Sequence, residues 1–140
     1  MKKIINGKLY NTDTAREVGW RSQNNPGDFY YVCETLYCKK TGEYFLHGDG
    51  GPLTQYAETV GQNQWRGGER IIPMNLQAAK EWAELHLTGE EYEKEFGPVV
   101  EDDSRVSINL SVSASTAERI RRAAQEKGIS MSALIDQMFA

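Results

Sequence analysis

An alternation of apolar and small polar residues near the C-terminus is the clearest pattern in the chain. In this pattern, within residues 105–140, the odd-numbered positions are polar: Ser107, Asn109 and Ser111. The positions between them are apolar: Val106, Ile108, Leu110 and Val112. A period of two is typical of a β-strand with one apolar face. The sequence therefore predicts a strand at 106–112.

Two short helices are predicted after this strand. Ser115 and Glu118 have the spacing of a capping box at a helix start. Gly128 stands where a helix end favours a left-handed residue, and Ser130 can cap a second helix. Each helix has an apolar face, formed by Ala117, Ile120 and Ala124 in the first and by Met131, Leu134, Ile135 and Met138 in the second.

One strand and two short helices bury too little surface to be stable alone, because domains below about 40 residues usually need a partner, a metal or disulfides. A single strand also leaves both edges unpaired. Antiparallel pairing of two copies would solve both problems. The sequence thus predicts a homodimer whose interface includes Val106, Ile108, Leu110, Ile120, Leu134 and Ile135.

The order of strand, helix, glycine turn and helix resembles the ribbon-helix-helix family, to which the Arc and Met repressors belong. The resemblance rests on Leu110-Ser111, Ile120, Ala124, Gly128, Ser130 and Leu134-Ile135. It implies that the paired strands enter the major groove of operator DNA. The residues expected at the DNA are Arg105, Ser107, Asn109, Ser111 and Ser130. The alternative is a tail that only dimerises, since no outward strand residue after Arg105 is basic.

The first part of the sequence predicts a separate α+β domain over residues 1–97, followed by an acidic linker at 98–104. Strands are expected in a hairpin around Asn6-Gly7, at 29–39, at 43–47 and at 70–74. Helices are expected from 13 or 14 to 19, at 53–60, at 76–87 with inward Leu76, Ala79 and Ala83, and after Thr88. Residues 48–52 and 61–68 are expected to be loops.

Charge divides the chain unevenly. Residues 1–103 carry eleven basic and seventeen acidic residues, a net charge of −6, whereas residues 105–140 carry five basic and three acidic, a net charge of +2. This distribution fits nucleic-acid contact at the C-terminal end only. No apolar run is long enough for a membrane span, and the first residues lack the apolar core of a signal peptide, so a cytoplasmic location is expected.

No catalytic or metal-binding motif is evident, and we expect a protein without enzymatic activity, cofactor or metal. Cys33 and Cys38 have an odd spacing that places them on opposite faces of a strand. Neither His47 nor His86 lies beside a nucleophile motif. Exposed aromatic residues near an arginine are good interface anchors, and the candidates for binding a partner are Tyr30, Tyr44, Trp65 and Arg66. Packing in the core is the alternative for each aromatic.

Residues 5–15, 34–37, 40–46 and 68–73 together resemble a small domain found in proteins of phages, plasmids and conjugative elements of Gram-positive bacteria. Some proteins that resemble it are anti-CRISPR proteins, which inhibit Cas9. The resemblance implies a non-enzymatic inhibitor that binds Cas9 or its guide-RNA complex and is dimeric through its tail. The alternative is a ribbon-helix-helix regulator or antitoxin, with residues 1–97 as a sensor or a partner-binding module.

Overall fold

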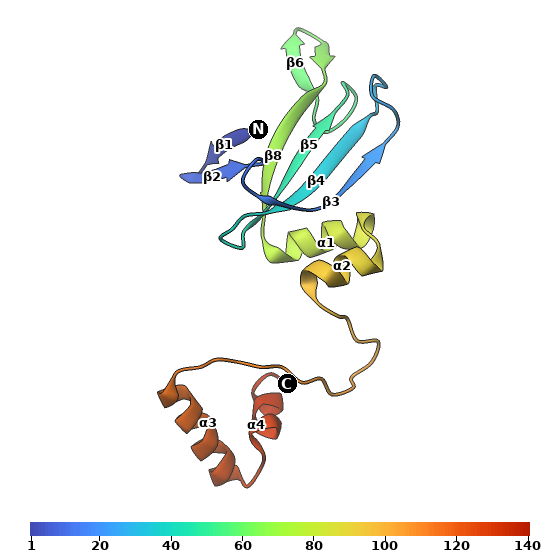
Figure 1. Cartoon of the computed structure of the whole chain (residues 1–140). Coiled ribbons are helices and arrows are strands. Elements are labelled where there is room, and N and C mark those ends of the chain that lie inside the picture. The colour runs from blue at the N-terminus through green and yellow to red at the C-terminus, as the bar shows by residue number, and fades with distance from the viewer. The chain divides into compact units, whose positions relative to one another are not determined.

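A four-stranded antiparallel sheet is the centre of the N-terminal part of the chain (Figure 1). Its strand order is β3-β4-β5-β8, formed by Arg16–Gln23, Val32–Cys38, Tyr44–Gly50 and Gly68–Met74. The computed structural model describes all 140 residues and divides them into two units, Met1–Val99 and Val100–Ala140. The α+β class predicted from the sequence is confirmed.

One face of the sheet packs against two helices, α1 (Leu76–His86) and α2 (Gly89–Phe96). The core here consists of Leu36, Leu46, Ala79, Trp82 and Ala83. Asn75 caps α1 by accepting the Ala78 amide at 2.8 Å, and Thr88 forms the predicted capping box of α2. Leu76 was expected to point inward, but it is 53% exposed because it lies at the first turn, before the helix meets the sheet.

The other face is covered at one end by a hairpin of β1 (Lys2–Ile5) and β2 (Lys8–Asn11). Asn6 and Gly7 both have positive φ, 51° and 77°, as the two-residue turn of such a hairpin requires. Tyr10 of the hairpin meets Phe45 edge to face, with ring centroids 5.4 Å apart. The hairpin and the central β4–β5 pair are both where the sequence predicted strands.

Two predicted helices are wrong. The first, from residue 13 or 14 to 19, is a turn followed by β3, in which Gly19 pairs with Leu36. The amide of Ala15 bonds to the Asn11 carbonyl in this turn, so Thr14 caps nothing. The second, at 53–60, is a turn followed by β6 (Glu58–Gly61). In both places strand pairing outweighs a local helix signal: β3 pairs with β4, and β6 pairs with β7, the next strand along the chain.

The two predicted loops also contain strand residues. Gly48 and Gly50 belong to β5, and Gln64–Arg66 forms β7, which pairs with β6. A Cβ atom at Gly48 would lie 2.0 Å from the Tyr56 hydroxyl. Glycine at this position therefore leaves room for the Tyr56 side chain against the strand.

The C-terminal unit contains α3 (Ala114–Lys127) and α4 (Met131–Met138). Gly128 ends α3 in the left-handed conformation, with φ 66°, and Ser130 caps α4, both as predicted. The N-cap of α3 is Ser113, so the capping box expected at Ser115 is wrong; Glu118 lies 3.3 Å from Arg122 instead.

No strand forms at 106–112 within the single chain, contrary to the sequence prediction. A strand is defined by hydrogen bonds to a neighbouring strand, and no other segment of the chain pairs with these residues. No helix of either unit has the length and apolar character needed to cross a bilayer.

Candidate functional site

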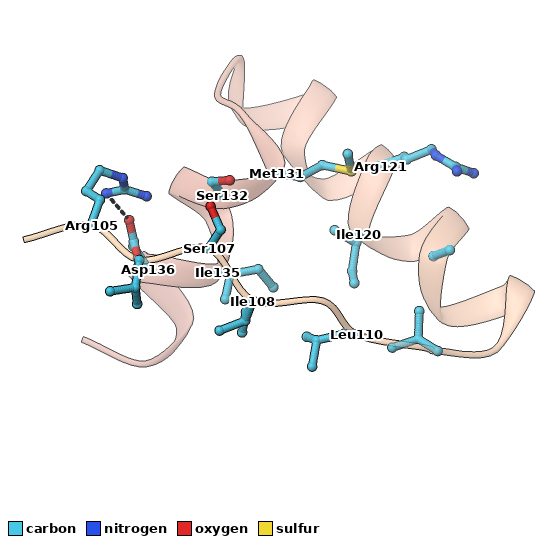
Figure 2. Close-up of a pocket in the computed structure, with 13 residues that line it drawn as sticks. Arg105, Ser107, Ile108, Leu110, Ile120, Arg121, Met131, Ser132, Ile135 and Asp136 are labelled. Atoms are coloured by element: carbon cyan, nitrogen blue, oxygen red, sulfur yellow. Dashed lines mark hydrogen bonds and ion pairs between the residues drawn. The ribbon is translucent and has the colours of Figure 1, made fainter. Parts of the chain in front are cut away.

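An open apolar groove lies between the extended segment 105–112 and helices α3 and α4 of the C-terminal unit (Figure 2). Its volume is about 730 Å³. Figure 2 shows Ile120 and Ile135 pointing from the two helices toward the segment that carries Ile108 and Leu110. The apolar residues that line the groove are Val106, Ile108, Leu110, Val112, Ala117, Ile120, Met131 and Ile135.

The apolar side chains of the segment are largely exposed to solvent. Ile108 is 70% exposed and Leu110 is 73% exposed, and Val106 is similar at 65%. The buried side chains of this unit are Ala124 and Leu134. A row of largely exposed apolar residues at alternate positions has the composition of an interface.

Leu134 is far less exposed than Val106, Ile108 and Leu110, which are also predicted dimerisation residues. It is 3% exposed within the single chain and does not line the groove. Helices α3 and α4 contact each other, and the buried Leu134 and Ala124 lie one on each of them. Leu134 is therefore buried within one copy, and its part in a dimer interface stays a prediction.

The residues predicted to contact DNA do not all share one environment. Ser107 lines the groove, whereas Asn109 and Ser111 are exposed and do not line it. The Arg105 guanidinium forms an ion pair with Asp136 of α4 at 2.9 Å, which Figure 2 marks. The Ser130 hydroxyl accepts the Ala133 amide at 3.0 Å, so it serves as a helix cap.

In the N-terminal unit, exposed aromatic residues lie in the loop before β4 and in the β6–β7 hairpin. Tyr30 is 56% exposed and Trp65 is 54% exposed, as expected for interface anchors. Arg66 is exposed and pairs with Glu58 at 3.2 Å. Phe29 and Leu53 are also exposed, at 62% and 53%, and the Leu53 amide donates to the Phe29 carbonyl at 3.0 Å. The sequence pattern did not identify these two residues.

Tyr44 does not belong to this exposed group, because it packs in the core. Its ring lies 5.6 Å from that of Phe96, and its hydroxyl donates to Glu95 at 3.3 Å. Burial, together with the negative charge of Glu95, raises the pKa of Tyr44 to about 12. The core alternative therefore describes Tyr44, because the residue faces α2.

A buried carboxylate, Glu34, joins four parts of the N-terminal unit. Its side chain is 3% exposed. Oε1 accepts from Arg21 Nε at 2.7 Å and from Trp82 Nε1 at 3.1 Å. Oε2 accepts from Gln55 Nε2 at 2.9 Å and from the Tyr56 hydroxyl. We call these five residues the Glu34 network. With both oxygens fully engaged by protein donors, Glu34 is suited to holding the fold together.

The Glu34 network predicts a loss of stability in acid. Burial alone would raise the pKa of Glu34, but hydrogen bonds from Tyr56, Trp82 and Arg21 hold it below the ordinary 4.5. A depressed pKa contributes stability that is present above about pH 4.5 and is lost as the pH falls through the folded-state pKa. We expect the urea midpoint to fall as the pH is lowered below about 4.5, and to fall less steeply in Glu34→Gln. Parallel curves for the two proteins would contradict this assignment.

Comparison of the chain with protein-family models, with curated proteins and with solved structures gives no match.

Proposed function

We propose that the protein is a homodimer held together by a ribbon-helix-helix arrangement of residues 105–140. The observation that carries the proposal is the exposed apolar row formed by Val106, Ile108, Leu110 and Val112 beside the open groove. In the dimer, residues 106–112 of two copies pair antiparallel, and the apolar side chains fill the grooves of both copies. A two-fold interface of this kind presents the same surface from each copy.

The paired strands would form a two-stranded ribbon, which fits the major groove of B-DNA. Asn109 and Ser111 are exposed and free to meet base edges, and an asparagine can contact adenine through two hydrogen bonds. The net charge of +2 on residues 105–140 favours the approach of the phosphate backbone. We therefore propose operator DNA as a ligand of the C-terminal unit.

For the N-terminal unit we propose inhibition of Cas9 by binding, without enzymatic activity. This proposal rests on the resemblance of residues 5–15, 34–37, 40–46 and 68–73 to the domain found in some anti-CRISPR proteins. The net charge of −6 on residues 1–103 suits an encounter with the basic nucleic-acid channel of Cas9. The exposed Tyr30 and Trp65 are available as anchors. The second candidate is a DNA-binding regulator or antitoxin, supported by the groove of the tail.

Asn109→Ala separates the two functions. Loss of a two-bond contact to adenine should weaken binding to the protein's own operator by about 1–3 kcal/mol, roughly 5- to 150-fold. The operator would be selected from a random DNA library and measured by gel shift at fixed salt. Cas9 cleavage of a linear target, titrated with the full-length protein, should be inhibited equally by wild type and Asn109→Ala.

The controls for this pair of assays lie on the same chain. Leu85→Ala changes an exposed residue of α1 and should alter neither assay. Absence of inhibition by wild type at large excess over Cas9 would leave the regulator as the function. Unchanged operator affinity in Asn109→Ala would contradict base contact by this residue.

A further inference from the structure

One end of one sheet face in the N-terminal unit is only partly covered: Trp20, Ser22 and Glu69 are exposed, whereas Cys33, Thr35, His47 and Asp49 are half-buried. The β1–β2 hairpin covers the end that holds Phe45 and Ile71. Beyond the hairpin, two rows of directly paired residues run across the strands. The first row is Trp20, Thr35 and His47, on β3, β4 and β5. The second row is Ser22, Cys33, Asp49 and Glu69, on β3, β4, β5 and β8. Directly paired residues share a face of the sheet. We call this surface the open sheet face: Trp20, Ser22, Cys33, Thr35, His47, Asp49 and Glu69.

The open sheet face is negatively charged and contains no lysine or arginine. Asp49 and Glu69 stand directly opposite each other on neighbouring strands, an arrangement of like charges that is unfavourable by itself. His47 Nε2 lies 2.9 Å from Glu69. The chain's ion pairs do not include Asp49. A cation bound between Asp49 and Glu69 would relieve their repulsion.

Trp20 adds an aromatic surface to these carboxylates. It lies at the edge of the sheet on β3 and is 59% exposed, whereas the tryptophan of α1, Trp82, is 7% exposed. The face of an indole ring attracts a guanidinium or ammonium group, and arginine is the commoner partner. Tryptophan is also frequent among the residues that dominate binding energy at protein interfaces.

We infer that the open sheet face binds an arginine-rich segment of a partner protein, with guanidinium groups stacked on Trp20 and paired with Asp49 and Glu69. The carboxylates of this face repel nucleic-acid phosphates, so a basic protein segment fits better than DNA or RNA. The inference adds a surface to the proposed protein-binding role of the N-terminal unit. It holds for any partner with such a segment, so a failure to inhibit Cas9 would leave it standing.

Nuclear magnetic resonance of the full-length protein labelled with nitrogen-15 tests the inference. The three tryptophans give three indole signals, which Trp→Phe variants assign. The probe is a short peptide of alternating arginine and glycine. Its addition should shift the Trp20 indole signal saturably and leave those of Trp65 and Trp82 in place. A shift of Trp65 instead, or no shift at all, would overturn the inference.

Two double variants, each of which removes two negative charges, test whether peptide binding depends on the open sheet face or on the overall acidity of the protein. Asp49→Asn with Glu69→Gln should weaken peptide binding about tenfold, which corresponds to about 1.4 kcal/mol. Glu84→Gln with Glu93→Gln removes two charges from exposed positions on α1 and α2 and should change the affinity less than about twofold. If both double variants lost the same peptide affinity, the binding would depend on net charge and not on the open sheet face, and the inference would be overturned. An equal Trp20 shift with duplex DNA would identify a nucleic-acid surface and overturn the proposal.

Discussion

Leu110→Asp should convert the proposed dimer, twice 15.8 kDa, into a monomer at micromolar concentration. Leu110 is 73% exposed in the single chain, so the substitution removes little packing from the fold of one copy. In the proposed dimer each copy buries its own Leu110 side chain, so one substitution removes two buried leucines. Burial of each leucine contributes about 1.5–3 kcal/mol, so the two together account for roughly 3–6 kcal/mol. Dimer dissociation should therefore increase on the order of 100- to 10,000-fold, and the buried aspartates would add to this.

Light scattering coupled to size-exclusion chromatography measures this change directly. Leu85→Asp is the matched control, because Leu85 is 79% exposed on α1 of the N-terminal unit and should leave the mass unchanged. A dimer that survives Leu110→Asp would place the interface elsewhere than in residues 106–112. A monomeric wild type at micromolar concentration would remove the support for a ribbon-helix-helix arrangement.

Glu34→Ala should lower the free energy of unfolding of the N-terminal unit by about 3–5 kcal/mol, a large fraction of the stability of a typical domain. Alanine leaves the Arg21 guanidinium without its 2.7 Å carboxylate partner. The buried indole N–H of Trp82 and hydroxyl of Tyr56 lose their acceptor at the same time. Each buried donor left without an acceptor costs about 1–3 kcal/mol.

Urea unfolding followed by tryptophan fluorescence reports on this unit, because Trp82 belongs to both the core and the Glu34 network. Glu58→Ala is the control, since it breaks the exposed Glu58–Arg66 pair and should cost less than about 1 kcal/mol. A loss of the same small size in Glu34→Ala would mean that water replaces the missing carboxylate, and that the network contributes little.

The elements that the sequence predicted correctly depend on signals within a few residues. Asn6-Gly7 defines the first hairpin, and Asn75, Thr88 and Ser130 each accept the backbone amide three residues later. These features need no information about the rest of the fold, so a single sequence is sufficient to place them.

The errors arose where distant segments decide the structure. Thr14 and Glu17 have capping-box spacing, yet Glu17 pairs with Tyr37 in the sheet. In the Glu34 network the glutamate bonds to partners up to 48 positions away in the sequence, and an isolated glutamate in a strand pattern carries no sign of such partners. Tyr44 has the same residue type as Tyr30, and only the position of α2 makes it a core residue. The strand expected at 106–112 needs a neighbour that the single chain does not contain.

The Glu34 network also bears on how the protein folds during its synthesis. Trp82 follows Glu34 by 48 residues, and ribosomes add about 5–20 residues per second, so the carboxylate has to wait roughly 2–10 s for its last donor to be made. Until then the β4–β5 hairpin lacks the helix that covers Leu36 and Leu46. The N-terminal unit therefore completes its core only after α1 has left the exit tunnel, and the nascent chain carries an unfinished sheet with exposed edges up to that moment.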